Sequence, residues 1–226
     1  MRSRWLISLS VAASIIYLAT QHWQLWQPFP GSALVKGFAV GPLALLAWQA
    51  RRERHDAGLL ALALAFCTAG DILLDLDPRF FAFGLALFLL AHITYTGLFV
   101  RNRTLGIKRD WKMGAAVLCI LLYSVTLSIW IVPSTGALAV PVILYVCALT
   151  IMVSSALVAR LAQRWVGVGA VLFLVSDSLL AIHKFKQPVP LRDYLVWTTY
   201  YLGQCGIAFG FLASAAYPAR FRSASR

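Results

Sequence analysis

Residues 137–159 read ALAVPVILYVCALTIMVSSALVA, a run without a single charged side chain. A helix that crosses the hydrocarbon core of a membrane needs about 20 consecutive, mostly apolar residues, so this run predicts a transmembrane helix. The rest of the chain has the same bias, because 61% of its 226 residues are hydrophobic and only 12% are charged. Soluble domains are about half apolar and about a quarter charged. The composition therefore excludes a soluble globular enzyme, a disordered chain and a disulfide scaffold, and it indicates a membrane protein.

Further apolar runs lie on both sides of this one. The first in the chain is short and follows Arg2 and Arg4, so a signal peptide is the alternative interpretation. No small-residue cleavage site follows it, and we interpret it as a helix. No long polar segment is left between the runs. We therefore expect an all-α membrane protein, with residues 1–226 as one integral membrane domain and eight transmembrane helices at about 5–20, 31–49, 58–76, 80–100, 113–132, 137–159, 165–182 and 194–216.

The charges of the loops predict the orientation of these helices. The net charge is +12, from 20 Lys and Arg against 8 Asp and Glu. In a soluble protein this excess would suggest nucleic acid, but we find no nucleic-acid motif, and the basic residues lie in short loops that suit contact with anionic lipids. Most of them fall in alternate loops on the side of both termini. The positive-inside rule then places both termini in the cytoplasm, across the inner membrane if the chain is bacterial, and requires an even number of helices. The other side receives only Arg79, Lys184, Lys186 and Arg192.

Two stretches indicate an internal repeat. TAGDILL at 68–74 and LVSDSLL at 174–180 both carry Asp-x-Leu-Leu late in a predicted span. Tyr95 follows Asp71 at the same interval as Tyr201 follows Asp177. We interpret the chain as two parallel four-helix repeats, residues 1–110 and 111–226, related by an axis along the membrane normal. Such an axis would place the two aspartates at a similar depth.

The two aspartates inside the spans are the main functional candidates. A carboxylate at bilayer depth costs roughly 2.5–3.5 kcal/mol on insertion scales, and such groups usually face a bundle interior or a watery cavity. We interpret Asp71 and Asp177 as functional, with a structural ion pair or an interhelical hydrogen bond as the alternative. Asp75 lies one turn after Asp71 on the same helix face. It also lies close to a loop, where an interfacial role is the alternative.

Other polar side chains could support these carboxyls. Lys36 lies early in the second span, where it either snorkels outward or pairs with a carboxylate or a substrate phosphate. His92 and Tyr95 share a face of the fourth span, three residues apart. For the remaining candidates an ordinary hydrogen bond between helices is the alternative to a role at the site, and these candidates are His92, Tyr95, Tyr200, Tyr201 and Gln204.

Several motifs have only structural interpretations, and several classes of site are missing. The four cysteines lie in apolar runs without a CxxC pair or a histidine at ligand spacing, which indicates buried free thiols and no metal or redox site. The GxxxG spacings at 37–41 and 206–210 indicate close helix packing. Serine-hydrolase, zinc-protease, phosphate-loop and dinucleotide motifs are absent. Two membrane carboxyls supported by Lys, His and Tyr remain, and this set suits acid–base chemistry on a lipid or proton-coupled transport.

The strongest of these stretches also resemble a known family. VSDSLLAIHKF at 175–185, PVP at 188–190 and TYYLGQ at 199–204 resemble one signature of the YhhN-like lysoplasmalogenase family, and GDILL at 70–74 with AHITY at 91–95 resembles another. The resemblance covers roughly residues 30–216. Lys36 matches a lysine of the family's second span, although Gly37 follows it where the family has proline.

The resemblance implies an eight-helix hydrolase of lysoplasmalogens, which are lysophospholipids with a vinyl-ether chain at sn-1. Its partners would be the lysophospholipid, water and membrane lipids, with no metal and no organic cofactor. A vinyl ether is cleaved by protonation of its β-carbon and addition of water to the resulting cation, for which two carboxyls in different protonation states are suited. We therefore expect Asp71 and Asp177 to be catalytic. The polar residues named above would support them, and Lys36 would hold the phosphate. A proton-coupled transporter or lipid-binding protein that uses the same carboxyls is the alternative.

Overall fold

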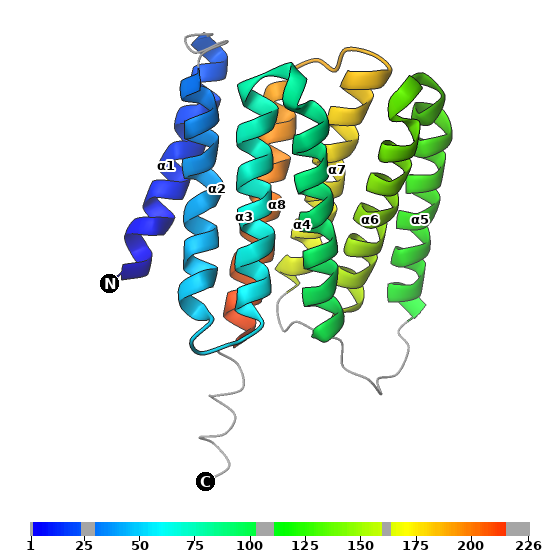
Figure 1. The fold of residues 1–226 in the computed structure, drawn as a ribbon. Helices are drawn as coiled ribbons and strands as arrows, with labels where there is room; N and C mark the ends of the chain where they lie inside the picture. Colours follow the sequence, from blue (N-terminus) through cyan, green and yellow to red (C-terminus); the bar gives the residue numbers. More distant parts are fainter. Residues whose placement is uncertain (1, 24–29, 103–110, 160–163, 216–226) are drawn as a thin grey trace.

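The computed structural model describes residues 2–23, 30–102, 111–159 and 164–215, and every element within these ranges is helical. The α-helices run alternately up and down in one bundle, and α1 begins at the end where α8 finishes (Figure 1). Each lies within about one turn of a predicted span. Single 3-10 turns, η1 (Pro78–Phe80), η2 (Val132–Ser134) and η3 (Gly136–Leu138), precede α4 and α6. The α-helices are α1 (Arg2–Trp23), α2 (Pro30–Ala50), α3 (Ala57–Leu76), α4 (Phe81–Arg101), α5 (Trp111–Ile131), α6 (Ala139–Val158), α7 (Trp165–Phe185) and α8 (Arg192–Ala215).

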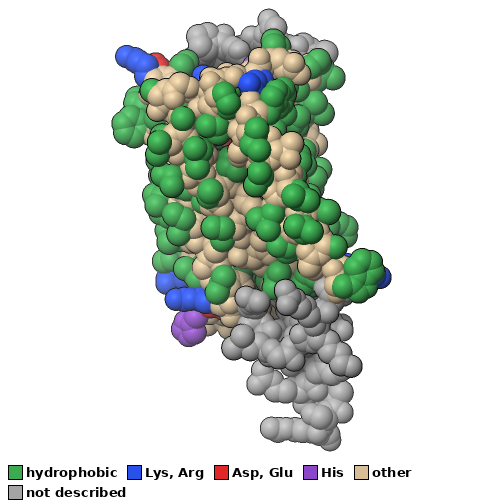
Figure 2. All heavy atoms as spheres, turned by 90° about the vertical axis from the view of Figure 1, so that its right-hand side faces the viewer, with side chains coloured by type: hydrophobic (Ala, Val, Ile, Leu, Met, Phe, Trp, Pro, Cys, Tyr) green, Lys and Arg blue, Asp and Glu red, His purple; other side chains and the backbone are tan. Residues whose placement is uncertain are grey.

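The helices from α2 to α7 identify a multi-pass integral membrane protein. Within the described ranges, these six are long and apolar enough to cross a membrane. Hydrophobic side chains cover the middle of the face shown in Figure 2, and Lys and Arg lie near its ends. The helices α1 and α8 have 22 and 24 residues but more polar compositions, so the count of eight spans stays a prediction. Seven of the fifteen basic residues on the side of the termini lie at 103–110, 160–163 and 216–226, outside the described residues, so the orientation also stays a prediction.

Glycines bring α7 and α8 close together. A Cβ atom on Gly169 would lie 2.6 Å from the carbonyl oxygen of Gly203, so only glycine allows this approach. On α8, a Cβ atom on Gly206 would lie 3.0 Å from the Trp165 carbonyl oxygen. On α2, a Cβ atom on Gly37 would lie 3.1 Å from the side chain of Ile72. Both GxxxG spacings therefore lie at helix contacts, as predicted.

A second close approach fixes the position of Asp71. A Cβ atom on Gly70 would lie 2.8 Å from the Phe88 ring and 3.3 Å from the Gly84 carbonyl oxygen of α4. Because Asp71 follows Gly70 directly, this contact holds the aspartate beside α4.

The turn between α3 and α4 begins at Asp77, whose side chain accepts a hydrogen bond from the backbone N–H of Arg79 at 2.7 Å. Hydrogen bonds from the Arg79 guanidinium hold the pKa of this exposed carboxyl below its ordinary value.

The position of α5 sets it apart from the other described helices. It lies at the edge of the bundle beside α6 (Figure 1), and it buries only Ser124 and Ile131. The buried hydrophobic core lies instead along the inner faces of the other helices, with Phe99, Phe173 and Phe211 among its largest fully buried side chains. Most of α5 is therefore available to lipid.

Candidate active site

A cavity of about 310 Å³ opens near the end of the bundle where α3 and α7 finish and α4 and α8 begin. Both membrane aspartates line it. Their helices, α3 and α7, lie far apart in the chain, so the bundle brings together the two carboxyls that the sequence singled out. Most of the lining is polar or aromatic, and its polar members are Tyr17, Lys36, Asp71, Asp75, Tyr145, Ser176, Asp177, Lys184, Arg192, Asp193 and Tyr200.

Asp71 is held by one phenol. Its Oδ2 accepts a hydrogen bond of 2.6 Å from the hydroxyl of Tyr200 on α8, and both residues are buried. The Tyr200 ring is packed edge-on against Phe88 and Phe173, with centroid distances of 5.9 and 5.2 Å. This aromatic packing fixes the phenol and, through it, the carboxyl.

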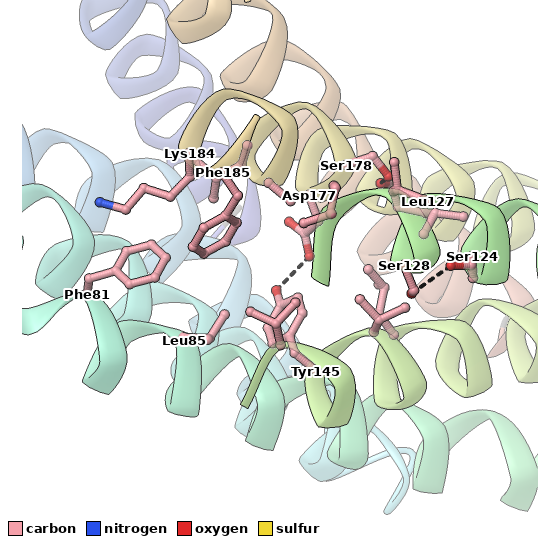
Figure 3. Close-up of a pocket in the computed structure, with 17 residues that line it drawn as sticks. Phe81, Leu85, Ser124, Leu127, Ser128, Tyr145, Asp177, Ser178, Lys184 and Phe185 are labelled. Atoms are coloured by element: carbon pink, nitrogen blue, oxygen red, sulfur yellow. Dashed lines mark hydrogen bonds between the residues drawn. The ribbon is translucent and has the colours of Figure 1, made fainter. Parts of the chain in front are cut away.

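Asp177 is held by a chain of two partners. Its Oδ2 accepts a hydrogen bond of 2.6 Å from the hydroxyl of Tyr145 on α6, and Figure 3 shows the two side chains facing each other. The Tyr145 oxygen lies 3.0 Å from Nε2 of His92, which lies 3.5 Å from the same carboxyl oxygen. His92 is fully buried on α4, and its Nδ1 has no hydrogen-bond partner in the described part of the chain. An imidazole N–H at Nε2 would donate to Tyr145 while Tyr145 donates to Asp177.

Lys36 does not snorkel away from the site. Its Nζ forms an ion pair of 2.8 Å with Asp75, and both side chains are largely buried. The ammonium also lies 4.8 Å from the centroid of the Tyr17 ring and 5.8 Å from that of Trp197. Of the alternatives open from the sequence, the structure shows the pairing with a carboxylate. Asp75 is accordingly a member of the cavity wall.

Four of the predicted support residues, His92 among them, lie outside the cavity wall. The Tyr95 hydroxyl donates to Oε1 of Gln204 at 2.6 Å, and both side chains are fully buried between α4 and α8. The Tyr201 hydroxyl lies 2.8 Å from Oγ of Ser10, which ties α8 to α1. These contacts are the interhelical hydrogen bonds that the sequence left open as the alternative. Tyr200 and His92 contact the two carboxyl networks directly.

Tyr145 is the carboxyl partner that the sequence analysis missed. It lies inside the apolar run quoted first, with no motif around it. The available signal is general: a buried phenol needs a hydrogen-bond partner, so a lone tyrosine in a fully apolar span points toward a polar group on a neighbouring helix.

Two further basic residues line the cavity, and the described residues form no metal site. Lys184 has its Nζ 4.7 Å from the centroid of the Phe81 ring, while Arg192 pairs with Asp193. Among the described residues, no group of three His, Cys, Asp or Glu side chains is arranged to hold a metal ion.

The cysteines are free thiols, but they are not all buried as predicted. Cys67 is buried, whereas Cys119 and Cys147 are exposed on the bundle surface. Apolar helix faces that meet lipid accept a small hydrophobic side chain as readily as a core does, so an apolar run does not distinguish the two locations.

The arrangement is suited to proton transfer. Two carboxyls, each hydrogen-bonded to one phenol, line the same cavity beside a lysine–aspartate ion pair. Carboxyls in different surroundings hold protons with different strengths, which lets one act as an acid while the other acts as a base.

Comparisons with known proteins find relatives that are named lysoplasmalogenases. A lysoplasmalogenase of Mycobacterium tuberculosis is 34% identical over 171 residues, which cover 74% of this chain and 64% of that protein. Lysoplasmalogenase TMEM86B of Rattus norvegicus is 31% identical over 222 residues, 93% of this chain and 85% of that protein. Lysoplasmalogenase TMEM86A of Bos taurus is 32% identical over 169 residues, 70% of this chain and 67% of that protein. No solved structure shows a significant match.

The match to the mycobacterial relative spans somewhat less than two thirds of that protein's length. The model of the YhhN family matches residues 31–211 of this chain, from the start of α2 to near the end of α8. Both membrane aspartates and all of their hydrogen-bond partners fall within this range. The chain belongs to the YhhN family.

Proposed function

We propose that this chain hydrolyses the vinyl-ether bond of lysoplasmalogens and releases a fatty aldehyde and a glycerophospho-choline or -ethanolamine. The observation that carries the proposal is the pair of carboxyls, Asp71 and Asp177, on the wall of one cavity. The relatives named above as lysoplasmalogenases support the substrate class. They also favour hydrolysis over the proton-coupled transport that the sequence left open.

The first step is proton transfer to carbon. The protonated carboxyl of the pair gives its proton to the vinyl carbon remote from the ether oxygen, and the electron pair of the double bond forms the new C–H bond. The carbon next to the oxygen becomes an oxocarbenium ion. The ionised second carboxyl stabilises this cation in a site of low dielectric, where such an interaction is strong.

Water completes the reaction and restores the pair. The second carboxylate takes a proton from a water molecule as the water oxygen bonds to the cationic carbon, which gives a hemiacetal. The hemiacetal C–O bond to glycerol then breaks: the second carboxyl returns its proton to the glycerol oxygen, and the first carboxylate takes the hemiacetal hydroxyl proton. One water molecule is consumed, and both carboxyls regain their starting states.

The residues around the two carboxyls have supporting roles. Tyr200 and the pair of Tyr145 and His92 position the two carboxyls through the hydrogen bonds described above. The Lys36–Asp75 ion pair lies on the same cavity wall as Asp71.

Aldehyde release from purified protein in detergent tests the proposal. Detergent removes the sealed compartment that a transporter needs, so only a hydrolase changes the lipid. The wild type is expected to release aldehyde from a lysoplasmalogen, and Asp71→Asn and Asp177→Asn are each expected to lose at least about 100-fold in kcat, since general acid–base catalysis contributes roughly 100- to 10,000-fold. Asp56→Asn, at the opposite end of α3, is the matched control.

Two results would contradict the proposal. One is a wild-type protein that binds lysoplasmalogen and releases no aldehyde. The other is an asparagine variant of either membrane aspartate that folds normally and retains the activity of the control.

A further inference from the structure

A second, apolar hollow, which Figure 3 shows, shares part of its lining with the cavity. It lies between α4, α5, α6 and α7, and we call it the α5 slot. The slot and the cavity have Tyr145, Asp177 and Lys184 in common, together with three apolar residues. Asp71 lines the cavity but not the slot. Asp177 therefore lies where the polar cavity meets the apolar slot.

The wall of the α5 slot is suited to a hydrocarbon chain. Beyond Asp177 and Tyr145 it consists mainly of aliphatic side chains such as Leu127, Val146 and Leu149. Burying apolar surface against such a wall is favourable, at roughly 25 cal/mol per Å². Ser128 donates its hydroxyl to the backbone oxygen of Ser124 at 2.7 Å (Figure 3), so this hydroxyl hydrogen is directed to the helix and not into the slot.

The burial pattern of α5 also indicates that the inward face of this helix forms a wall of the slot. Ser124 and Ile131 are the buried residues that the structure describes on this helix, and both line the slot. The inward face of α5 is thus a wall of the slot, while its other face is exposed and apolar, as lipid contact requires. A lipid chain in the slot would pass between surfaces that already suit it.

A cation lies on the same side of α7 as Asp177. Lys184 follows Asp177 by seven residues, two helical turns or about 10 Å along the axis, and both line the slot and the cavity. Among the described basic residues of the cavity wall, Lys36 pairs with Asp75 and Arg192 with Asp193, whereas Lys184 contacts only the Phe81 ring. Lys184 is thus the wall cation whose charge no carboxylate offsets in the described structure.

We propose that the α5 slot binds the alkenyl chain of the lysoplasmalogen, with the substrate phosphate at Lys184 and the chain-side vinyl carbon at Asp177. This inference rests on the proposed function and deepens it. The carbon that receives the proton is the one on the chain side of the double bond, so a chain in the slot presents that carbon to Asp177. Asp177 is then the acid. Asp71, which lines the polar cavity and not the slot, activates the water.

Photolabelling tests the slot without depending on catalysis. The probe is a saturated 1-O-alkyl lysophosphocholine, which has no vinyl ether to cleave, with a diazirine partway along the alkyl chain. Specific labelling is the part that an excess of unlabelled alkyl lysophosphocholine removes. It is expected on peptides that contain the slot residues of α5, α6 and α7.

Paired variants on α5 sharpen the test. Ser128→Phe fills the slot and is expected to lower specific labelling at least about fivefold and raise KM for a long-chain lysoplasmalogen about tenfold, with a short-chain alkenyl substrate cleaved as in the wild type. Ile129→Phe adds a ring to the adjacent residue, which is 73% exposed on the outer face, and is expected to change neither quantity. Ser128→Leu repeats the measurement with a smaller side chain if the phenylalanine variant does not fold.

The outcomes separate this inference from the proposed function. Specific labelling at the groove of α1, α2 and α3 that Leu9, Phe38 and Leu45 line would overturn the slot. Equal effects of Ser128→Phe on long and short substrates would also overturn it, even if aldehyde is released. Slot labelling that Ser128→Phe abolishes, in a protein that releases no aldehyde, would support the binding site and contradict the hydrolase.

Discussion

Replacing Tyr145 with phenylalanine removes one oxygen from the centre of the site and leaves the ring in place. That oxygen donates to Asp177 at 2.6 Å and lies 3.0 Å from Nε2 of His92. Without it, the remaining partner of the Asp177 oxygen is His92 at 3.5 Å, longer than a normal N–H···O hydrogen bond. The substitution therefore loosens the carboxyl without altering its charge or the shape of the cavity.

The size of the effect follows from these contacts. A hydrogen bond to a charged group contributes about 1.5–3 kcal/mol, and 1.36 kcal/mol corresponds to about tenfold in rate. We expect kcat to fall roughly 10- to 100-fold. The variant also leaves both nitrogens of the buried His92 without a good partner in the described structure, since Nδ1 already has none. One unsatisfied buried polar group costs about 1–3 kcal/mol, so the free energy of unfolding is expected to fall by about that amount.

Steady-state aldehyde release in detergent measures the first effect, and thermal unfolding measures the second. Tyr123→Phe is the control, because it removes the same oxygen from an exposed position on α5. A positioning role predicts that kcat falls while KM stays within about twofold, since Tyr145 acts through Asp177 and not on the substrate. If Tyr145→Phe matches the control in kcat, or if it raises KM alone, Tyr145 does not position a catalytic group.

Two further predictions concern binding and packing. Lys184→Met is expected to raise KM about tenfold with kcat unchanged, because the substrate phosphate loses a charged hydrogen bond of about 1.5 kcal/mol. Lys186→Met is the control, since it removes an ammonium that contacts Ser134 and does not line the cavity. An equal KM for both variants would exclude a phosphate contact at Lys184. Gly169→Ala is expected to lower the free energy of unfolding by about 1–3 kcal/mol through overpacking, because its Cβ atom would lie 2.6 Å from a backbone oxygen of α8. Gly58→Ala is the control, because a Cβ atom there meets nothing within 4 Å, and it should be close to neutral in thermal unfolding. Equal losses of stability in the two alanine variants would contradict the close packing of α7 and α8.

The helices could be predicted from the sequence because their signal is local. Each apolar run had to satisfy its own backbone hydrogen bonds in lipid, so hydropathy alone located all of them to within about one turn. The candidate carboxyls were also accessible in this way, since a charge in an apolar run is conspicuous wherever it occurs. The repeat predicted only a similar depth for Asp71 and Asp177, and that both line one cavity is a finding of the structure.

The partners of these carboxyls could not be predicted, because a partner depends on packing between helices. Helical periodicity shows that Tyr95 and His92 share a face, but it does not show that Tyr95 meets Gln204 in the core while His92 reaches the Asp177 network. The same limit applies to Tyr145, whose partner depends on how α6 packs against α4 and α7. Glycine contacts set these distances, and a sequence shows that a glycine is present without showing which backbone it approaches.

The predicted repeat would make Asp71 and Asp177 equivalent positions, and their surroundings in the structure differ. The offset that relates Asp71 to Asp177 also relates Lys36 to Val142 and Asp75 to Ala181. The ion pair beside the first aspartate thus corresponds to two apolar residues beside the second, and both of these line the α5 slot.

The same offset aligns Tyr145, the partner of Asp177, with Ala39, which cannot form such a hydrogen bond. One half of the chain therefore surrounds its carboxyl with charge, and the other half surrounds its carboxyl with hydrocarbon and one phenol. A lysoplasmalogen has the same division into a polar and an apolar part, joined at the vinyl ether. These differences between the halves predict that introducing the ion pair near Asp177 removes the preference of the slot for hydrocarbon. Val142→Lys with Ala181→Asp would place an ion pair in the slot and is expected to abolish specific labelling by the alkyl-chain probe. Retained slot labelling in a folded double variant would show that these positions do not determine where the chain binds.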